Sequence, residues 1–196
     1  MIEGLMPEEL RPSEAEKEFL TLAYNRFYDI YEEIESESFW GKNGWYRLCK
    51  IRDAFLIYTE VLHYPPIKWV LERLKKTRPP FEVEIGKELF RLIRNILAHM
   101  PFFEKWDDVW INRNVVNWYK DGQAIDRFLK KHEGKGDVKF RYWLENIKKM
   151  NYLSINFPTG YVSNKKIFLK DILKEKEGVS FAFQYMRYIL NTQVEK

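Results

Sequence analysis

Hydrophobic residues recur every three or four positions through the first half of the chain. Over residues 13–36 they form one stripe of an amphipathic helix, and Ser13 with Glu16 matches the capping box that satisfies the first backbone donors of a helix. The same periodicity predicts further helices over residues 45–63 and 85–99, with a shorter one between them that carries Trp69, Val70 and Leu74 and runs to Arg78-Pro79-Pro80. The last of these ends at His99, because Pro101 disfavours helical geometry in the residue before it.

The pattern becomes less regular after residue 101. Residues 102–133 predict two short helices, the second ending in basic residues ahead of Gly134. In residues 137–196 the spacing of Trp143, Ile147 and Met150 predicts a helix, and a second periodic run predicts a last helix over residues 181–190. Between them, residues 152–163 predict a loop or a small hairpin.

These elements predict an all-α fold. We expect a helical bundle over residues 1–136, followed by a basic, partly irregular and mainly helical extension over residues 137–196 that packs on the same domain. The chain has 196 residues, and 9 Gly and 8 Pro are too few for the many turns of a sandwich or barrel. A hydrophobic share of 45% supplies enough apolar side chains for a packed core.

Cysteine content, hydropathy and charge restrict the class of protein further. Cys49 is the single cysteine, so an intramolecular disulfide and a zinc finger are excluded, and we expect a small buried hydrophobe in a cytoplasmic protein. No apolar run approaches the roughly 20 residues that cross a bilayer. Residues 1–111 hold 16 Lys and Arg against 20 Asp and Glu, whereas residues 112–196 hold 17 against 9. A basic second half favours contact with a polyanion.

Catalytic histidine chemistry has three candidate residues. His63 ends a predicted helix and is expected to cap it, and His132 is expected at a solvated helix exit. His99 shares a polar strip with Arg91 and Asn95, since residues four apart lie about 40° apart on a helix, whereas Arg94 stands about 140° from His99. The sequence has no phosphate-binding glycine loop, no paired-histidine zinc motif and no serine elbow.

The segment Arg94-Asn95-Ile96-Leu97-Ala98-His99 resembles the signature of the HEPN family, in which an arginine, a polar residue and a histidine follow one another on a late helix of an all-α bundle. The spacing recurs at Arg127 and His132, but there Phe128 stands in the polar position. The resemblance covers residues 13–133 and implies a metal-independent endoribonuclease without cofactor. Many such proteins are toxins or antiviral effectors that act as homodimers.

The resemblance implies that Arg94, Asn95 and His99 are catalytic. It also implies a composite site in a homodimer, where Arg94 of one chain complements His99 of the other, and an antitoxin or defence protein as partner. Pro101 stands where a subset of the family, paired with a nucleotidyltransferase antitoxin, carries a tyrosine, so control through such a tyrosine is not expected. Candidate RNA contacts, which fit a solvated face equally well, are Arg91, Lys130, Lys131, Lys135, Lys139 and Arg141.

Several alternatives stay open at this point. The chain could be a non-catalytic helical module that binds RNA or a nucleotide, or a protein-interaction bundle in which the motif is structural. The acidic residues Glu104, Asp107 and Asp108 could hold a metal ion or charge the first turn of a helix. Three tryptophans could stack on bases or fill the core, namely Trp106, Trp110 and Trp118.

Overall fold

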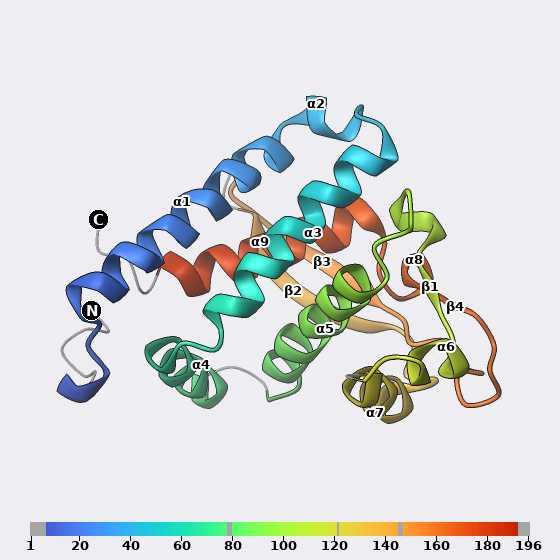
Figure 1. The fold of residues 1–196 in the computed structure, drawn as a ribbon. Coiled ribbons are helices and arrows are strands. Elements are labelled where there is room, and N and C mark those ends of the chain that lie inside the picture. Colours follow the sequence, from blue (N-terminus) through green and yellow to red (C-terminus); the bar gives the residue numbers. More distant parts are fainter. Residues whose placement is uncertain (1–6, 78–79, 121, 145–146, 192–196) are drawn as a thin grey trace.

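The computed structural model describes residues 7–77, 80–120, 122–144 and 147–191, and these are mostly helical (Figure 1). The longer helices are α1 (Glu14–Glu35), α3 (Gly44–Val61), α4 (Pro65–Thr77), α5 (Pro80–His99), α7 (Gly122–His132) and α9 (Glu175–Asn191). The shorter ones are the 3-10 helices η2 (Glu8–Leu10) and η3 (Trp106–Asp108) and the α-helices α2 (Glu37–Trp40), α6 (Arg113–Asn117) and α8 (Leu169–Ile172). Two antiparallel pairs complete the fold, β1 (Trp110–Ile111) with β4 (Ile167–Phe168) and β2 (Val138–Leu144) with β3 (Lys149–Ile155).

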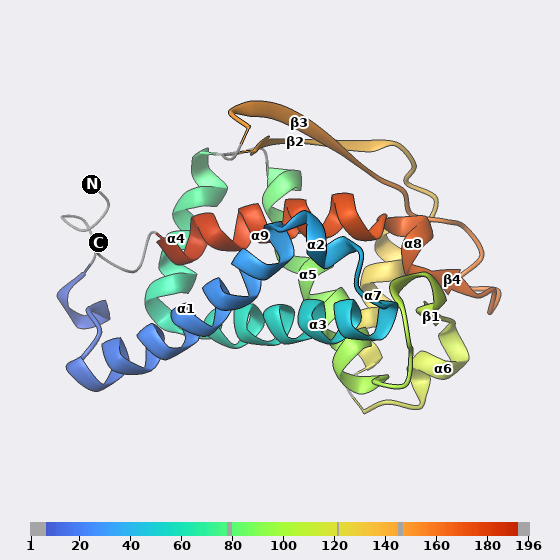
Figure 2. The same cartoon turned by 90° about the horizontal axis from the view of Figure 1, so that it is seen from above.

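The first helix begins where its capping box predicts. The Ser13 side chain accepts the backbone N–H of Glu16, and the Glu16 carboxylate accepts the backbone N–H of Ser13 at 2.8 Å. The predicted apolar stripe is buried only in its second half, whereas Phe19 and Leu22 are exposed. Figures 1 and 2 show the reason, since the first turns of α1 extend beyond the helices on which the rest of it packs.

Helix α5 lies at the centre of the molecule and contacts two other helices, α3 and α9, through Phe90. This ring is fully buried and lies 5.8 Å from Phe55 of α3 and 5.9 Å from Phe181 of α9, between ring centroids. Tyr58 of α3 and Tyr185 of α9 complete the aromatic cluster at 6.0 and 5.7 Å. The last helix therefore shares one core with the helices that precede it in the chain.

The helix predicted through Trp143, Ile147 and Met150 is wrong, because this region is the hairpin β2–β3. Burial alternates along β2, where Phe140 and Tyr142 face inward and the residues between them face outward. The apolar residues at helical spacing are exposed, and two of them, Trp143 and Met150, pair across the strands. The expected loop or hairpin at residues 152–163 begins inside β3 and is irregular after residue 155.

The tryptophans differ in their surroundings. Trp106 is fully buried, and its indole N–H donates to the carbonyl of Leu173 at 2.9 Å, so it belongs to the core. Trp110 is half-buried beneath the ammonium of Lys166, whereas Trp118 is exposed. Cys49 is half-buried, which corrects the expected full burial. Within the described residues no helix is both long and apolar enough to cross a membrane.

The expectation of a solvated His132 is wrong, because its side chain has no exposed surface. The imidazole lies between Phe128 and Phe157, whose ring centroids are 4.7 and 5.0 Å away. Gly134 adopts a positive φ of 73°, which turns the chain after α7, and the backbone N–H of Phe157 then donates to the carbonyl of Lys135. A segment distant in sequence thus covers the helix end that looked solvated.

Burial, together with the nearby cations of Lys135 and Lys131, lowers the pKa of His132 to about 4. The carboxylate of Glu88, 3.8 Å from the imidazole Nε2, acts in the opposite direction. In the unfolded chain, His132 takes up a proton near pH 6.5, whereas in the folded chain its imidazole stays neutral down to about pH 4. Acidification between these values therefore destabilises the fold, by at most about 1.4 kcal/mol per pH unit.

We predict that His132→Phe flattens this dependence, since phenylalanine fills a similar aromatic space and takes up no proton. Urea unfolding at pH 7, 6 and 5 should show a free energy of unfolding that falls less steeply for the variant than for the wild type. Parallel pH profiles for the two proteins would contradict the buried neutral state of His132.

Candidate functional site

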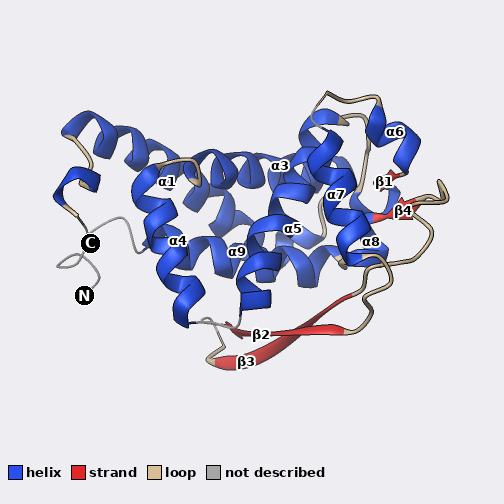
Figure 3. Ribbon diagram, turned by 90° about the horizontal axis from the view of Figure 1, so that it is seen from below, coloured by secondary structure: helices blue, strands red, loops and turns tan. Residues whose placement is uncertain are grey.

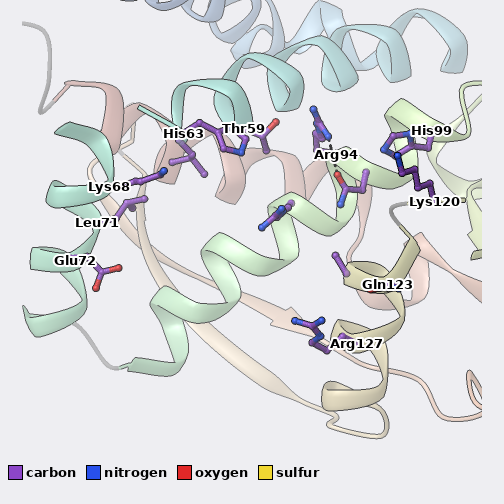
Figure 4. A pocket seen from close by; sticks show the side chains of 14 residues that line it. Thr59, His63, Lys68, Leu71, Glu72, Arg94, His99, Lys120, Gln123 and Arg127 are labelled. Atoms are coloured by element: carbon purple, nitrogen blue, oxygen red, sulfur yellow. Dashed lines mark hydrogen bonds between the residues drawn. The ribbon is translucent and has the colours of Figure 1, made fainter. Parts of the chain in front are cut away.

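A groove of about 910 Å³ lies between α3, α4, α5 and α7. Figures 3 and 4 show α5 between α4 and α7, and the side chains that line the groove come from all four helices. The lining residues are Thr59, Leu62, His63, Lys68, Leu71, Glu72, Arg91, Arg94, Asn95, His99, Lys120, Gln123, Ala124 and Arg127.

The groove is strongly basic. Five of its lining residues are cations, and Glu72 is the one acid among them. A second cavity of about 160 Å³ shares Arg91, Asn95 and Arg127 with the first and adds Lys131 and Glu88. The two cavities share lining residues along α5 and α7, and together we call them the basic channel; its excess of cations suits a polyanion longer than one phosphate.

The sequence of α5 explains why its polar side chains gather here. Leu89, Leu92, Ile93, Ile96 and Leu97 are buried, so most of the circumference of this part of the helix packs against neighbours. Four polar residues of the same stretch, Arg91, Arg94, Asn95 and His99, line the groove.

Arg94 is held by two oxygen atoms. Its Nη2 donates to Oε1 of Glu60 on α3 at 2.6 Å, and its Nη1 donates to Oδ1 of Asn95 at 3.1 Å. The side chain of Arg94 is 25% exposed and that of Glu60 is 63% exposed, so the acid meets the guanidinium at the groove's rim. Asn95 itself is buried, which fixes the amide that orients the arginine.

His99 is the last residue of α5 and is half-buried. Its ring lies 6.1 Å from that of Tyr119, and the next residue, Lys120, lines the groove with it. His99, Arg94 and Asn95 therefore line one groove in a single chain, although Arg94 stands about 140° from His99 on a helical wheel. All three residues thus belong to one groove without a second copy of the protein, and the homodimer stays a prediction.

His63 lines the same groove from the end of α3. Its imidazole Nδ1 lies 3.9 Å from Oε2 of Glu60, and its side chain is 66% exposed. Glu60 thus lies between His63 and Arg94, and its charge offsets part of the positive charge at this end of the groove.

The predicted RNA contacts fall into separate regions. Arg91 lines the main groove and Lys131 its extension, where the Lys131 ammonium lies 3.6 Å from the Glu88 carboxylate. Lys130 pairs with Asp126 one turn earlier on α7, at 2.6 Å. The others are exposed beyond the end of α7, Lys135 in the connection and Lys139 and Arg141 on the hairpin.

Sequence reasoning missed several groove residues. Lys68 and Lys120, which line the groove, and Glu60, which meets Arg94 at its rim, come from segments distant in sequence from the motif, and nothing in their local pattern marks them. Arg127 and His132 repeat the spacing of Arg94 and His99. Arg127 lines the groove, whereas His132 is in the core. The signal available was the spacing of Gln123, Arg127 and Lys131, which places one side chain per turn along one face of α7.

The acidic residues near His99 stand at the start of η3, where Asp107 and Asp108 occupy the first turn. Asp108 lies 3.7 Å from Lys105. Among the residues that the structure describes, no three potential ligands gather closely enough to hold a metal ion.

Comparison with protein-family models, with curated proteins and with solved structures found no match to this chain. The chemistry of the groove therefore has to be inferred from its own residues. Its cations can bind a polyanion, Asn95 orients the guanidinium of Arg94, and His99 supplies an imidazole, a group that can accept or donate a proton.

We predict that Arg91→Ala and Arg127→Ala each weaken the binding of inorganic tripolyphosphate severalfold, because each removes a cation from the channel. The slope of log affinity against log salt should also become shallower for both variants. Isothermal titration at two or more salt concentrations measures both effects. Arg52→Ala is the matched control, since Arg52 lines neither groove cavity and pairs with Asp53 at 3.5 Å. Equal losses in all three variants would contradict anion binding in the groove.

Proposed function

We propose that this protein is a metal-independent endoribonuclease of the HEPN type, with Arg94, Asn95 and His99 as its catalytic residues. The observation that carries the proposal is that these three residues, drawn from one helix, line a single basic groove. The resemblance of the motif supplies the reaction class, and the charge and volume of the groove support a sugar–phosphate chain as the ligand.

Arg94 provides the electrostatic part of this chemistry. Glu60 and Asn95 each use one N–H of the two terminal nitrogens, and because Nε is buried, the second hydrogen on each terminal nitrogen is what a phosphate in the groove can take. A guanidinium held in place before the substrate arrives stabilises the negative charge that grows on the phosphate in the transition state. Asn95 acts as the residue that positions Arg94.

His99 provides the proton transfer. A neutral imidazole takes the proton of a ribose 2′-hydroxyl, whose oxygen attacks the adjacent phosphorus, and an imidazolium returns a proton to the leaving 5′-oxygen. The products of this step are a 2′,3′-cyclic phosphate and a free 5′-hydroxyl. The resemblance further implies a toxin or antiviral effector that acts as a homodimer, and these remain proposals about its biology.

A second candidate function is an RNA- or nucleotide-binding module without catalysis. The contact between Arg94 and Glu60 favours it, because a carboxylate 2.6 Å from the guanidinium competes with a phosphate for the same donors. The two candidates make the same prediction for binding and differ in whether RNA is cleaved.

We predict that the wild type cleaves mixed RNA in the presence of EDTA and that His99→Ala and Arg94→Ala lower the rate by about 10²–10⁴-fold. Electrophoresis measures cleavage, and mass spectrometry identifies the cyclic phosphate ends. An RNA with 2′-O-methyl groups should resist cleavage, because it lacks the attacking hydroxyl.

His63→Ala is the matched control for loss of an imidazole from the groove, and circular dichroism confirms that each variant is folded. Binding without products supports the non-catalytic module. Cleavage that EDTA abolishes points to the acidic residues near His99, and equal cleavage by every variant points away from the groove. A His99→Ala variant that binds RNA normally but unfolds more easily would assign the motif a structural role.

A further inference from the structure

The outer face of the hairpin β2–β3 combines aromatic and basic side chains. In the register of the two strands, Arg141 lies opposite Tyr152 and Trp143 lies opposite Met150, and these four side chains share the outward face. Tyr152 is 62% exposed and Trp143 is 45% exposed. Two large rings and a guanidinium thus stand next to one another on a solvent-facing surface.

The inner face of the same hairpin explains why the outer face is open. Phe140 and Tyr142 lie 5.9 and 5.4 Å from Phe181 of α9, between ring centroids, and Leu153 is fully buried. Period-two alternation then directs every second residue of each strand away from the core. Figure 2 shows the hairpin as an outer layer over α9 and α5.

The charge on the hairpin favours an anionic partner. The strands β2 and β3 contain Lys139, Arg141 and Lys149 and no acidic residue. Asp137, directly before β2, lies 3.7 Å from Lys139 and offsets one of these charges. An apolar protein partner would gain nothing from this excess of cations, whereas a nucleic acid strand offers both phosphates for the cations and bases for the rings.

The hairpin also lies close to the basic channel along the chain. Lys131 lines the channel near the end of α7, and five residues separate that helix from β2, with the exposed Lys135 among them. Figure 3 shows the hairpin beside the face on which α4, α5 and α7 lie side by side. A strand that leaves the groove past Arg127 and Lys131 can therefore reach the outer face of the hairpin.

We propose that the outer face of β2–β3 is a second RNA-binding surface, on which bases of a single strand stack on Tyr152 and Trp143 while Arg141 and Lys139 contact phosphates. This inference rests on the proposed function for the nature of the ligand. It assigns the groove to the nucleotides at the reacting linkage and the hairpin to nucleotides farther along the same strand. Long RNA then binds more tightly than a short oligonucleotide.

The experiment uses the full-length chain with His99→Ala, so that RNA stays intact, and measures fluorescence anisotropy with labelled RNAs of 4 and 20 nucleotides. Adding the two exposed changes Trp143→Ala and Tyr152→Ala should weaken binding of the longer RNA by about tenfold or more and leave the shorter one unchanged. Phe19→Ala is the matched control, since Phe19 is an exposed ring on α1.

Unchanged binding of both RNAs by the hairpin variant overturns the proposal. A hairpin variant that binds RNA normally but no longer binds anionic phospholipid vesicles also overturns the proposal, because the face would then serve a membrane. The outcome is separate from catalysis: a wild type that cleaves no RNA while the hairpin variant binds long RNA weakly refutes the ribonuclease and supports the hairpin. A wild type that cleaves RNA, together with a hairpin variant whose binding of long RNA is unchanged, supports the ribonuclease and refutes the hairpin surface.

Discussion

The burial of helix α5 is the constraint on which the candidate site depends. Phe90 ties this helix to α3 and α9, and apolar residues at most other positions of its second half are buried. Because neighbouring elements enclose most of this helix, its few polar side chains point toward the side that stays open. Arg91, Arg94, Asn95 and His99 therefore line one groove, and any change that loosens the packing of α5 should disturb all four together.

The pairing of Arg94 follows from the same packing. A guanidinium that is only 25% exposed loses much of its hydration, which would cost several kcal/mol without compensating partners. Glu60 and Asn95 supply those partners, and Glu60 can do so because α3 packs directly on α5. The arrangement orients the arginine before any ligand arrives, but it also places a carboxylate where a phosphate has to compete. Under the proposed function, the balance between orientation and competition decides whether the groove cleaves RNA or only binds it.

Much of the helical part of the fold could be predicted from the sequence, because the signals there are local. The capping box at Ser13 and the proline at position 101 fix helix ends through contacts within a few residues. The hairpin was missed because Trp143, Ile147 and Met150 imitate helical spacing, while the period-two burial of Phe140 and Tyr142 depends on α9. The local pattern shows which residues of a segment are apolar. Whether they are buried at the spacing of a helix or of a strand depends on tertiary packing.

The same division applies to the candidate site. The motif on α5 could be found because its members are neighbours in sequence, whereas Glu60 and Arg127 reach the groove from helices whose own patterns carry no such signal. His132 was expected to be solvated and is buried. Its basic, glycine-flanked helix end is covered by Phe157 from a later segment. Long-range contacts of this kind have no signature in a single sequence.

Occupation of the groove by a sugar–phosphate linkage can be observed directly at the imidazoles, because the three histidines occupy different surroundings. Proton–carbon NMR spectra of the histidine rings, recorded while a non-cleavable 2′-O-methyl dinucleotide is added, report on each ring separately. The groove assignment predicts large, saturable shifts for His99, smaller ones for the exposed His63 and none for the buried His132. An unchanged His99 resonance at saturating dinucleotide would contradict it.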